Sequence, residues 1–236
     1  MTLSKNIVLM CLNLKNNRLG DKTGTVLAEA LCQNIRLETN QLDESAGTVL
    51  AEALCKNTTL TNLGLSCNKL DLECNQLGES AGKALVETLC KNTTLTNLDL
   101  NAYKLGELAG KALAETLCKN TSLTNLNLGN NQLGESAGKA LAEALYINTI
   151  TMLTNLDLSR NELGESAGKA LAEILCKNTT LTNLNLRWNK LGKSEGKELA
   201  EALCKNTSLI NLSLGNNKLS YSAGKAPTEA LCKNTP

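Results

Sequence analysis

The stretch Gly134–Lys139, GESAGK, has the residue types of a phosphate-binding loop and lies between an expected strand and an expected helix. Such a loop needs the spacing G-x-x-x-x-G-K followed by Ser or Thr, because its backbone amides cradle phosphates and the hydroxyl holds magnesium. Here the glycines stand one residue too close, and Ala140 occupies the hydroxyl position. The same run recurs at Gly78 and Gly164, as a structural element would. We therefore predict no nucleotide and no other cofactor.

Carboxylates are the next candidates for chemistry. The strand pattern places Asp71, Glu73 and Asp99 on one face of a sheet, and paired carboxylates can divide the roles of acid and base. No partner group suggests that division, so we interpret these residues as an acidic recognition patch. The sequence has no histidine, which removes the commonest general base and the zinc patterns that contain histidine. We predict neither catalysis nor a metal site.

Seven of the ten cysteines follow the repeat described below, because each of them falls at the end of an expected helix. Equivalent positions on adjacent packed helices lie roughly 8–10 Å apart, which exceeds the roughly 7 Å limit between the Cα atoms of a disulfide. We interpret the seven as small, partly buried apolar residues. We do not predict a pair between Cys67 and Cys74, which would need the segment between them to fold back. The seven are Cys32, Cys55, Cys90, Cys118, Cys176, Cys204 and Cys232.

Most of the chain consists of imperfect copies of one unit, seen best at Leu153–Thr180. An asparagine marks each copy, and the commonest spacing between these asparagines is 28 residues, a length typical of repeats that carry a full helix. In Leu123–Leu133 the pattern is L-x-x-L-x-L-x-x-N-x-L, which predicts a short strand with one buried face. The markers are Asn17, Asn40, Asn68, Asn75, Asn131, Asn161, Asn189 and Asn217, with Tyr103 in place of one.

The residues around each strand and helix have expected structural roles. We expect Asn161 to bond the backbone of the turn, with stacked copies repeating the contact. The apolar spacing in Ala167–Leu175 predicts a helix, with Ser166 as its N-cap and Asn178 as a left-handed residue at its end. Gly168 recurs in every unit, which indicates that the start of the helix packs too closely on a turn to admit a Cβ.

Parallel strands joined by right-handed helical crossovers place all strands on one face and all helices on the other. Strands lie about 4.8 Å apart and helices nearly twice that, so the stack curves with its strands inside. The sequence predicts an α/β fold, a right-handed solenoid in the shape of a horseshoe segment. We expect residues 1–236 to form a single domain of about eight units.

The run from Leu181 to Leu203, LTNLNLRWNKLGKSEGKELAEAL, resembles the ribonuclease-inhibitor type of leucine-rich repeat. That type also occurs in NOD-like receptors and in the activating protein of the GTPase Ran. The resemblance implies a non-catalytic module that binds another protein through its concave face and ascending loops. A GTPase-activating protein of the Ran-activator type is an alternative. Both ends lack the polar caps usual in solenoids, so a partial or decaying array without a specific partner is another.

Three segments depart from the pattern, at residues 32–42, 60–77 and 223–236. The connection from Cys32 to Ile35 is five residues shorter than its counterpart elsewhere, too short for a full helix and a full strand. Two strand motifs, 63–65 and 70–72, occur without a helix between them, and parallel neighbours need a longer connection, so we expect only one in the sheet. Pro227 predicts a broken, frayed last helix.

Trp188 is the best candidate for partner binding, because it is the only tryptophan and is expected outside the leucine core. Its neighbours one unit away include Arg160, which we expect to stack on the indole. Exposed tryptophan with arginine is typical of interface hot spots. The alternative is that Trp188 replaced a small residue without consequence. The proposed surface consists of Asp157, Arg160, Glu162, Arg187, Trp188, Lys190, Asn216 and Lys218.

The remaining sequence features restrict the partner and the compartment. The formal net charge is +1, so nothing in bulk charge favours nucleic acid or an anionic membrane. No signal peptide and no run of roughly 18 apolar residues is visible. We expect a cytoplasmic, soluble monomer whose partner is another protein. In that compartment, sequons such as Asn120-Thr-Ser serve to end a helix and carry no glycan.

Overall fold

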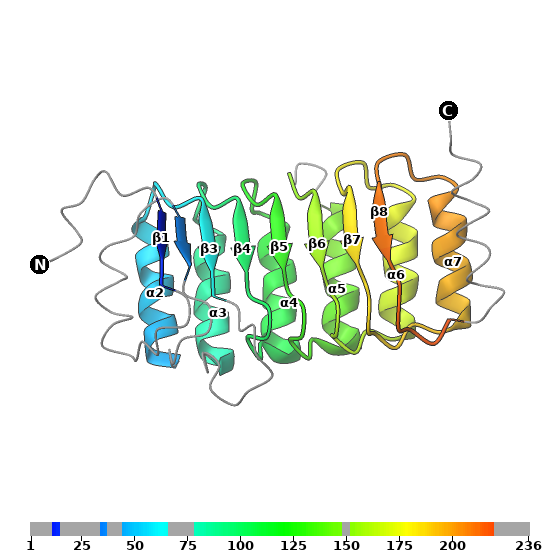
Figure 1. The fold of residues 1–236 in the computed structure, drawn as a ribbon, viewed down its shortest axis with the longest axis horizontal. Helices are drawn as coiled ribbons and strands as arrows, with labels where there is room; N and C mark the ends of the chain where they lie inside the picture. The colour runs from blue at the N-terminus through cyan, green and yellow to red at the C-terminus, as the bar shows by residue number, and fades with distance from the viewer. Residues whose placement is uncertain (1–10, 15–33, 37–43, 66–77, 148–151, 220–236) are drawn as a thin grey trace, which may run out of the picture.

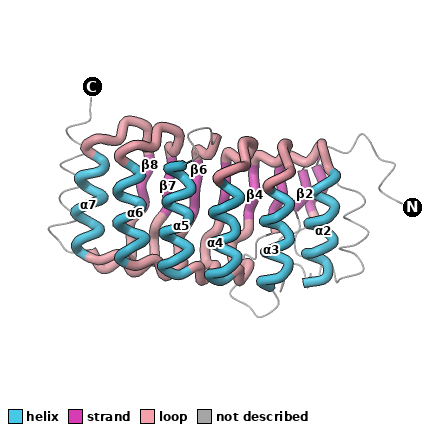
Figure 2. The backbone as a smooth tube through the Cα atoms, turned by 180° about the vertical axis from the view of Figure 1, so that it is seen from behind, coloured by secondary structure: helices cyan, strands magenta, loops and turns pink. Residues whose placement is uncertain are grey.

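The structure, a computed structural model, describes residues 11–14, 34–36, 44–65, 78–147 and 152–219. Within them, strands and helices alternate along a solenoid, with the strands on one face and the helices on the other (Figures 1 and 2). The strands are β1 (Cys11–Asn13), β2 (Asn34–Arg36), β3 (Asn62–Gly64), β4 (Asn97–Asp99), β5 (Asn125–Asn127), β6 (Asn155–Asp157), β7 (Asn183–Asn185) and β8 (Asn211–Ser213). The helices are α2 (Glu44–Lys56), α3 (Gly78–Leu89), α4 (Gly106–Leu117), α5 (Gly134–Ile147), α6 (Glu165–Leu175) and α7 (Lys193–Leu203).

The strands form one parallel sheet in which the order of the strands follows the chain, as the sequence predicts. β3 pairs directly with β4, with Leu63 opposite Leu98, so the motif at 63–65 supplies the strand of the sheet. Its competitor at 70–72 lies outside the described residues. β2 keeps its place between β1 and β3 despite the short connection before it. The predictions for 37–42 and for Pro227 also concern residues outside the described part.

The core between sheet and helices consists of leucine and alanine, as expected from a chain without phenylalanine. The central leucine of each strand from β3 to β7 is buried, and the leucines of the helices close over it. Tyr103 is the exception, because its ring fills the place of a marker asparagine and its hydroxyl is buried without a hydrogen-bond partner. Burial raises the pKa of Tyr103 well above its usual range, so the hydroxyl stays protonated.

The buried marker asparagines connect each unit to the one before it, which confirms the role predicted from the repeat. The side chain of Asn161 is fully buried. Its Nδ2 donates to the backbone oxygen of Leu128 at 2.8 Å, and its Oδ1 accepts from the N–H groups of Asn131 and Leu133 at 3.0 and 3.3 Å. Asn131 and Asn189 make equivalent bonds to the units that precede them. One amide thus satisfies three backbone groups that the preceding turn leaves unpaired.

A second row of asparagines lies after the helices, and here the expectation of a left-handed residue is wrong. Asn178 is absent from the residues with positive φ, because its side chain turns the backbone instead. Its Oδ1 accepts from the N–H groups of Thr180 and Leu181 at 3.1 and 2.8 Å. The equivalent Asn120 is buried, and its Nδ2 donates to Leu89 of the preceding unit at 2.8 Å. The sequons at these positions therefore serve the fold.

The predicted N-cap at Ser166 is also wrong. Helix α6 begins at Glu165, and no side chain of its own cap bonds the helix. The backbone N–H of Ser166 instead donates to the carboxylate of Glu135 in the preceding helix at 2.7 Å, and this bond lowers the pKa of Glu135. In α7 the cap comes from within the helix, because Glu195 accepts from the N–H of Gly192 at 2.6 Å. A carboxylate thus caps the start of each of these helices. In α6 it comes from the preceding helix, and in α7 it comes from the helix itself.

The recurring helix glycine marks a close contact between units, as predicted. A Cβ at Gly138 would lie 2.4 Å from Cδ2 of Leu163 and 2.9 Å from Cβ of Ala167, both in the next unit. Gly110 and Gly168 meet equivalent groups at similarly short distances. The glycine therefore sets how closely consecutive units stack.

Replacing Gly138 by alanine should lower the free energy of unfolding by about 1–2 kcal/mol, because overpacking outweighs the gain in helix propensity. Urea unfolding followed by circular dichroism measures the change. Lys139→Ala, on the exposed side of the same helix, is the control and should stay within about 0.5 kcal/mol. A Gly138→Ala protein more stable than the original would contradict the contact described.

Replacing Asn161 by alanine should cost about 2–4 kcal/mol, since it leaves several buried backbone groups without partners. The half-buried Asn155, which bonds side chains and no backbone group across the strand face, is the comparison. Asn155→Ala should cost only about 0.5–1.5 kcal/mol. If both variants lose the same free energy of unfolding in the urea experiment, the buried asparagines contribute no more to stability than those of the strand face.

Candidate partner-binding surface

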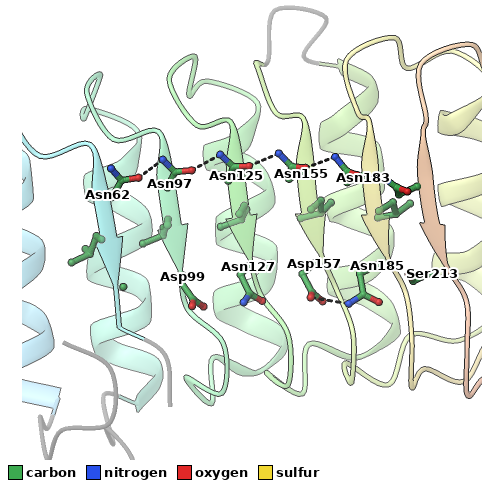
Figure 3. A pocket seen from close by; sticks show the side chains of 17 residues that line it. Asn62, Asn97, Asp99, Asn125, Asn127, Asn155, Asp157, Asn183, Asn185 and Ser213 are labelled. Carbon is green, nitrogen blue, oxygen red and sulfur yellow. Dashed lines mark hydrogen bonds between the residues drawn. The ribbon is translucent and has the colours of Figure 1, made fainter. Parts of the chain in front are cut away.

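The exposed strand face forms a groove of about 690 Å³ along the solenoid, lined by two rows of polar side chains (Figure 3). The first row starts at Asn62, and from Asn97 to Asn211 each amide donates to the asparagine on the preceding strand. The amides from Asn62 to Asn183 also donate to the threonine one residue earlier, for example from Asn125 to Thr124 at 2.9 Å. The donors of the amides from Asn97 to Asn183 are thus already used inside the protein. The row is Asn62, Asn97, Asn125, Asn155, Asn183 and Asn211.

The second row lies where the strands end and acts in the fold as well. Oδ1 of Asp157 accepts from the N–H of Ser159 at 2.8 Å, and Oδ2 accepts from Nδ2 of Asn185 at 2.8 Å. Asp99 bonds the N–H two residues ahead in the same manner. Acidic and amide residues alternate in this row because the turn requires only an acceptor. The sequence analysis missed this role of Asp157. Asp71 and Glu73, the other members of the expected acidic patch, lie outside the described residues.

The turns after strands β4 to β8 carry residues with a left-handed backbone, which non-glycine residues rarely adopt. The φ angles of Arg160, Glu162, Trp188 and Asn216 are 55°, 62°, 57° and 59°. Bonds to the next unit hold this conformation, since the N–H of Arg160 donates to the oxygen of Arg187 at 2.9 Å and that of Trp188 donates to Gly215 at 2.9 Å. Side chains at these positions project from a rigid edge.

Arg160 stacks on Trp188, as its position one unit earlier predicted. The guanidinium carbon lies 4.7 Å from the centre of the indole, and the indole keeps 49% of its surface exposed. Beside this pair, the ammonium of Lys190 forms an ion pair of 2.6 Å with Glu162. The structure thus brings Arg160, Glu162, Trp188 and Lys190 together.

Arg187, Asn216 and Lys218 complete the surface. Arg187 is exposed, and its Nε lies 3.3 Å from the point that a Cβ on Gly215 would occupy, so its side chain lies over the backbone of the next unit. Asn216 continues the column of Arg160 and Trp188, and the exposed Lys218 continues the column of Glu162 and Lys190. We call these seven residues, without Asp157, the Trp188 patch.

A second stacked pair lies on the helix face, where the sequence analysis expected none. The ammonium of Lys177 lies 4.6 Å from the ring centre of Tyr146 and 3.5 Å from its hydroxyl oxygen. A cavity of about 400 Å³ opens beside it between α5 and α6. The available signal was that Tyr146 stands where most units carry cysteine.

Within the described residues, four cysteines have known surroundings. Cys90, Cys118, Cys176 and Cys204 are free thiols, and burial followed by the charge of Glu115 raises the pKa of Cys118, which keeps it protonated. Cys90 and Cys204 are exposed, contrary to the expectation of partial burial, because they stand at the solvent edge of their helices. In the described ranges no three metal-ligating side chains come together, and no helix is long and apolar enough to cross a membrane.

Comparison with known proteins agrees with this geometry. A family model described as Leucine Rich repeat matches residues 5–28, 119–142, 149–172 and 177–200. No curated protein matches the chain. The structural class is therefore that of a leucine-rich-repeat solenoid, which agrees with the resemblance to the ribonuclease-inhibitor type of repeat seen in the sequence.

Solved structures with this architecture include three of low sequence identity. The structure of TLR13 in complex with a single-stranded RNA is 19% identical, with a TM-score of 0.52 over 89% of this chain and 26% of that one. The Caenorhabditis elegans tropomodulin C-terminal domain is 16% identical, with a TM-score of 0.48 over 78% and 92% of the two chains. Leiomodin-1 actin-binding site 2 is 20% identical, with a TM-score of 0.44 over 78% and 86%. At these identities the similarity concerns the fold alone.

The stacking of Arg160 on the indole predicts a shielded tryptophan. Arg160→Asn should increase acrylamide quenching of the fluorescence, because one face of the ring becomes open to solvent. Asparagine is suitable because Asn130 and Asn216 already occupy this left-handed position in other units. Trp188 is the only tryptophan, so the signal has a single source. Lys177→Ala on the helix face should leave quenching unchanged, and an unchanged Arg160→Asn signal would contradict the stacking.

Proposed function

We propose that this chain is a non-catalytic module that binds another protein through its strand face and adjoining loops, with the Trp188 patch at the centre of the interface. The observation that carries the proposal is the exposed indole stacked under Arg160 on a rigid edge. Tryptophan and arginine dominate interface hot spots, and a preorganised side chain loses little entropy on binding. The alternative of an inconsequential Trp188 does not account for an ordered stack flanked by the Lys190–Glu162 ion pair.

The strand groove supports the same proposal in a different way. Its asparagines are bonded to one another and to the neighbouring threonines, so a partner meets a satisfied polar surface. Such a surface suits a contact that forms and dissociates, because it exposes no broad apolar area that must stay covered. Asp157 belongs to this supporting surface, since both of its carboxylate oxygens accept internal bonds.

Affinity capture with matched variants tests the proposal. The variant Arg160→Asn with Trp188→Asn removes the stack and keeps residues that the repeat tolerates at that position. Loss of a hot-spot pair should weaken binding of the captured partners by about 30-fold or more. The control, Tyr146→Ala with Lys177→Ala, removes the equivalent stacked pair from the helix face and should leave capture unchanged. Circular dichroism confirms that both variants fold.

Two outcomes would count against this assignment. If the Trp188 variant retains the same partners at the same yield, the interface lies elsewhere. If instead the helix-face variant loses them, the Tyr146–Lys177 pair is the binding surface. Broad thermal unfolding of the unmodified chain, together with no specific partner, would support a decaying array.

A further inference from the structure

The charges of the Trp188 patch do not balance. Glu162 neutralises Lys190 through their ion pair of 2.6 Å. Arg160, Arg187 and Lys218 have no ion pair in the part of the chain that the structure describes. Asp157, the nearest carboxylate of the strand row, already accepts bonds from Ser159 and Asn185. Among the described residues, three cations thus lie around an exposed indole without an ion-pair partner.

This excess of positive charge is a property of the last described units and is not built into the repeat. Two units earlier, the positions equivalent to Arg187, Trp188 and Lys190 carry Gly129, Asn130 and Gln132, which are neutral. The whole chain has a formal net charge of only +1, so its acidic and basic residues balance elsewhere. A local positive field thus stands at one part of the loop edge.

The geometry leaves the cations available to a ligand. The Arg160 guanidinium lies over the indole, with its carbon 4.7 Å from the ring centre, and its N–H donors lie in the plane of the group. That planar fork matches a carboxylate, which accepts two parallel hydrogen bonds from it. Because the Arg160 N–H bonds the oxygen of Arg187, the two arginines start from adjacent backbones on neighbouring units.

From this arrangement we infer that the segment bound at the Trp188 patch is an acidic peptide, whose carboxylates pair with Arg160, Arg187 and Lys218 while an apolar side chain packs on the open surface of the indole. The inference rests on the proposed function and specifies the chemistry of the partner. Arg160 and Lys218 are separated by two unit spacings, roughly 10 Å at strand spacing. An extended peptide spans that distance in about three residues. Acidic residues at i and i+3 with an apolar residue between them therefore fit the patch.

Single-stranded RNA is the other ligand that combines with an aromatic ring and cations, since bases stack on tryptophan and phosphates pair with arginine. The patch favours the peptide because three unpaired cations match a few carboxylates better than a chain with a charge on every nucleotide.

The single tryptophan supplies a direct measurement, because any ligand at the patch changes the fluorescence of Trp188 alone. The probes are four twelve-residue ligands. The first is a peptide with Glu at every third position and Leu between. The second has Gln in place of Glu, the third has Lys in place of Glu, and the fourth is single-stranded oligouridine. Titration of the unmodified chain at low and high salt gives the affinities.

We expect the Glu peptide to bind at least about tenfold more tightly than the Gln or Lys peptide, as measured by the fluorescence of Trp188. Its affinity should fall at high salt. Arg187→Gln with Lys218→Gln, which keeps Trp188 and its stack, should lower that affinity by about tenfold. Lys119→Gln with Lys205→Gln removes two exposed lysines at helix ends and should change it less than twofold.

The other outcomes separate this inference from the proposed function. Equal binding of the Gln or Lys peptide would overturn the acidic preference and keep Trp188 as a peptide-binding surface. A response to oligouridine alone would overturn both the peptide and the protein partner. If no probe responds while captured proteins still require Trp188, the acidic chemistry is wrong and the proposed function stands.

Discussion

The structure depends on one interaction, the hydrogen bonding of a buried asparagine side chain to the backbone of the preceding unit. Short strands and tight turns leave many N–H and C=O groups unpaired, and a single amide such as that of Asn161 satisfies three of them. The asparagines after the helices repeat the solution at the other end of each unit. Leucine burial supplies the driving force for folding, but these amides fix how the units stack.

The conformation of the proposed binding surface follows from the same constraint. Residues such as Arg160 and Trp188 adopt a strained left-handed backbone because bonds to the next unit hold them there. The backbone at these positions is fixed, and the side chains are not needed by the core. The repeat can therefore change them freely, which is why Ala102, Asn130, Arg160, Trp188 and Asn216 share one conformation and differ in chemistry.

The sequence predicted the features that have a period. The strands, the helices, the packing glycine and the stack of Arg160 on Trp188 all follow from residues 28 positions apart. The sequence did not predict hydrogen bonds between units that no repeated motif signals. Examples are the bond from Ser166 to Glu135 and the bond from Asn185 to Asp157. Local rules placed an N-cap at Ser166 and a left-handed residue at Asn178. In the structure a carboxylate of the preceding helix bonds the N–H of Ser166, and the side chain of Asn178 itself turns the backbone. The Tyr146–Lys177 pair went unpredicted because its members stand 31 positions apart, outside the period of 28, and neither belongs to the strand motif.

The asparagine row on the strand face has a direction. From Asn97 to Asn183, every amide turns its nitrogen toward the lower-numbered strand and its oxygen toward the higher-numbered one (Figure 3). The amide dipoles are therefore aligned head to tail, and each bond polarises the next. The nitrogen of Asn97 thus faces β3 and the oxygen of Asn183 faces β8, so the strand face is polar along the solenoid axis as well as across its strands.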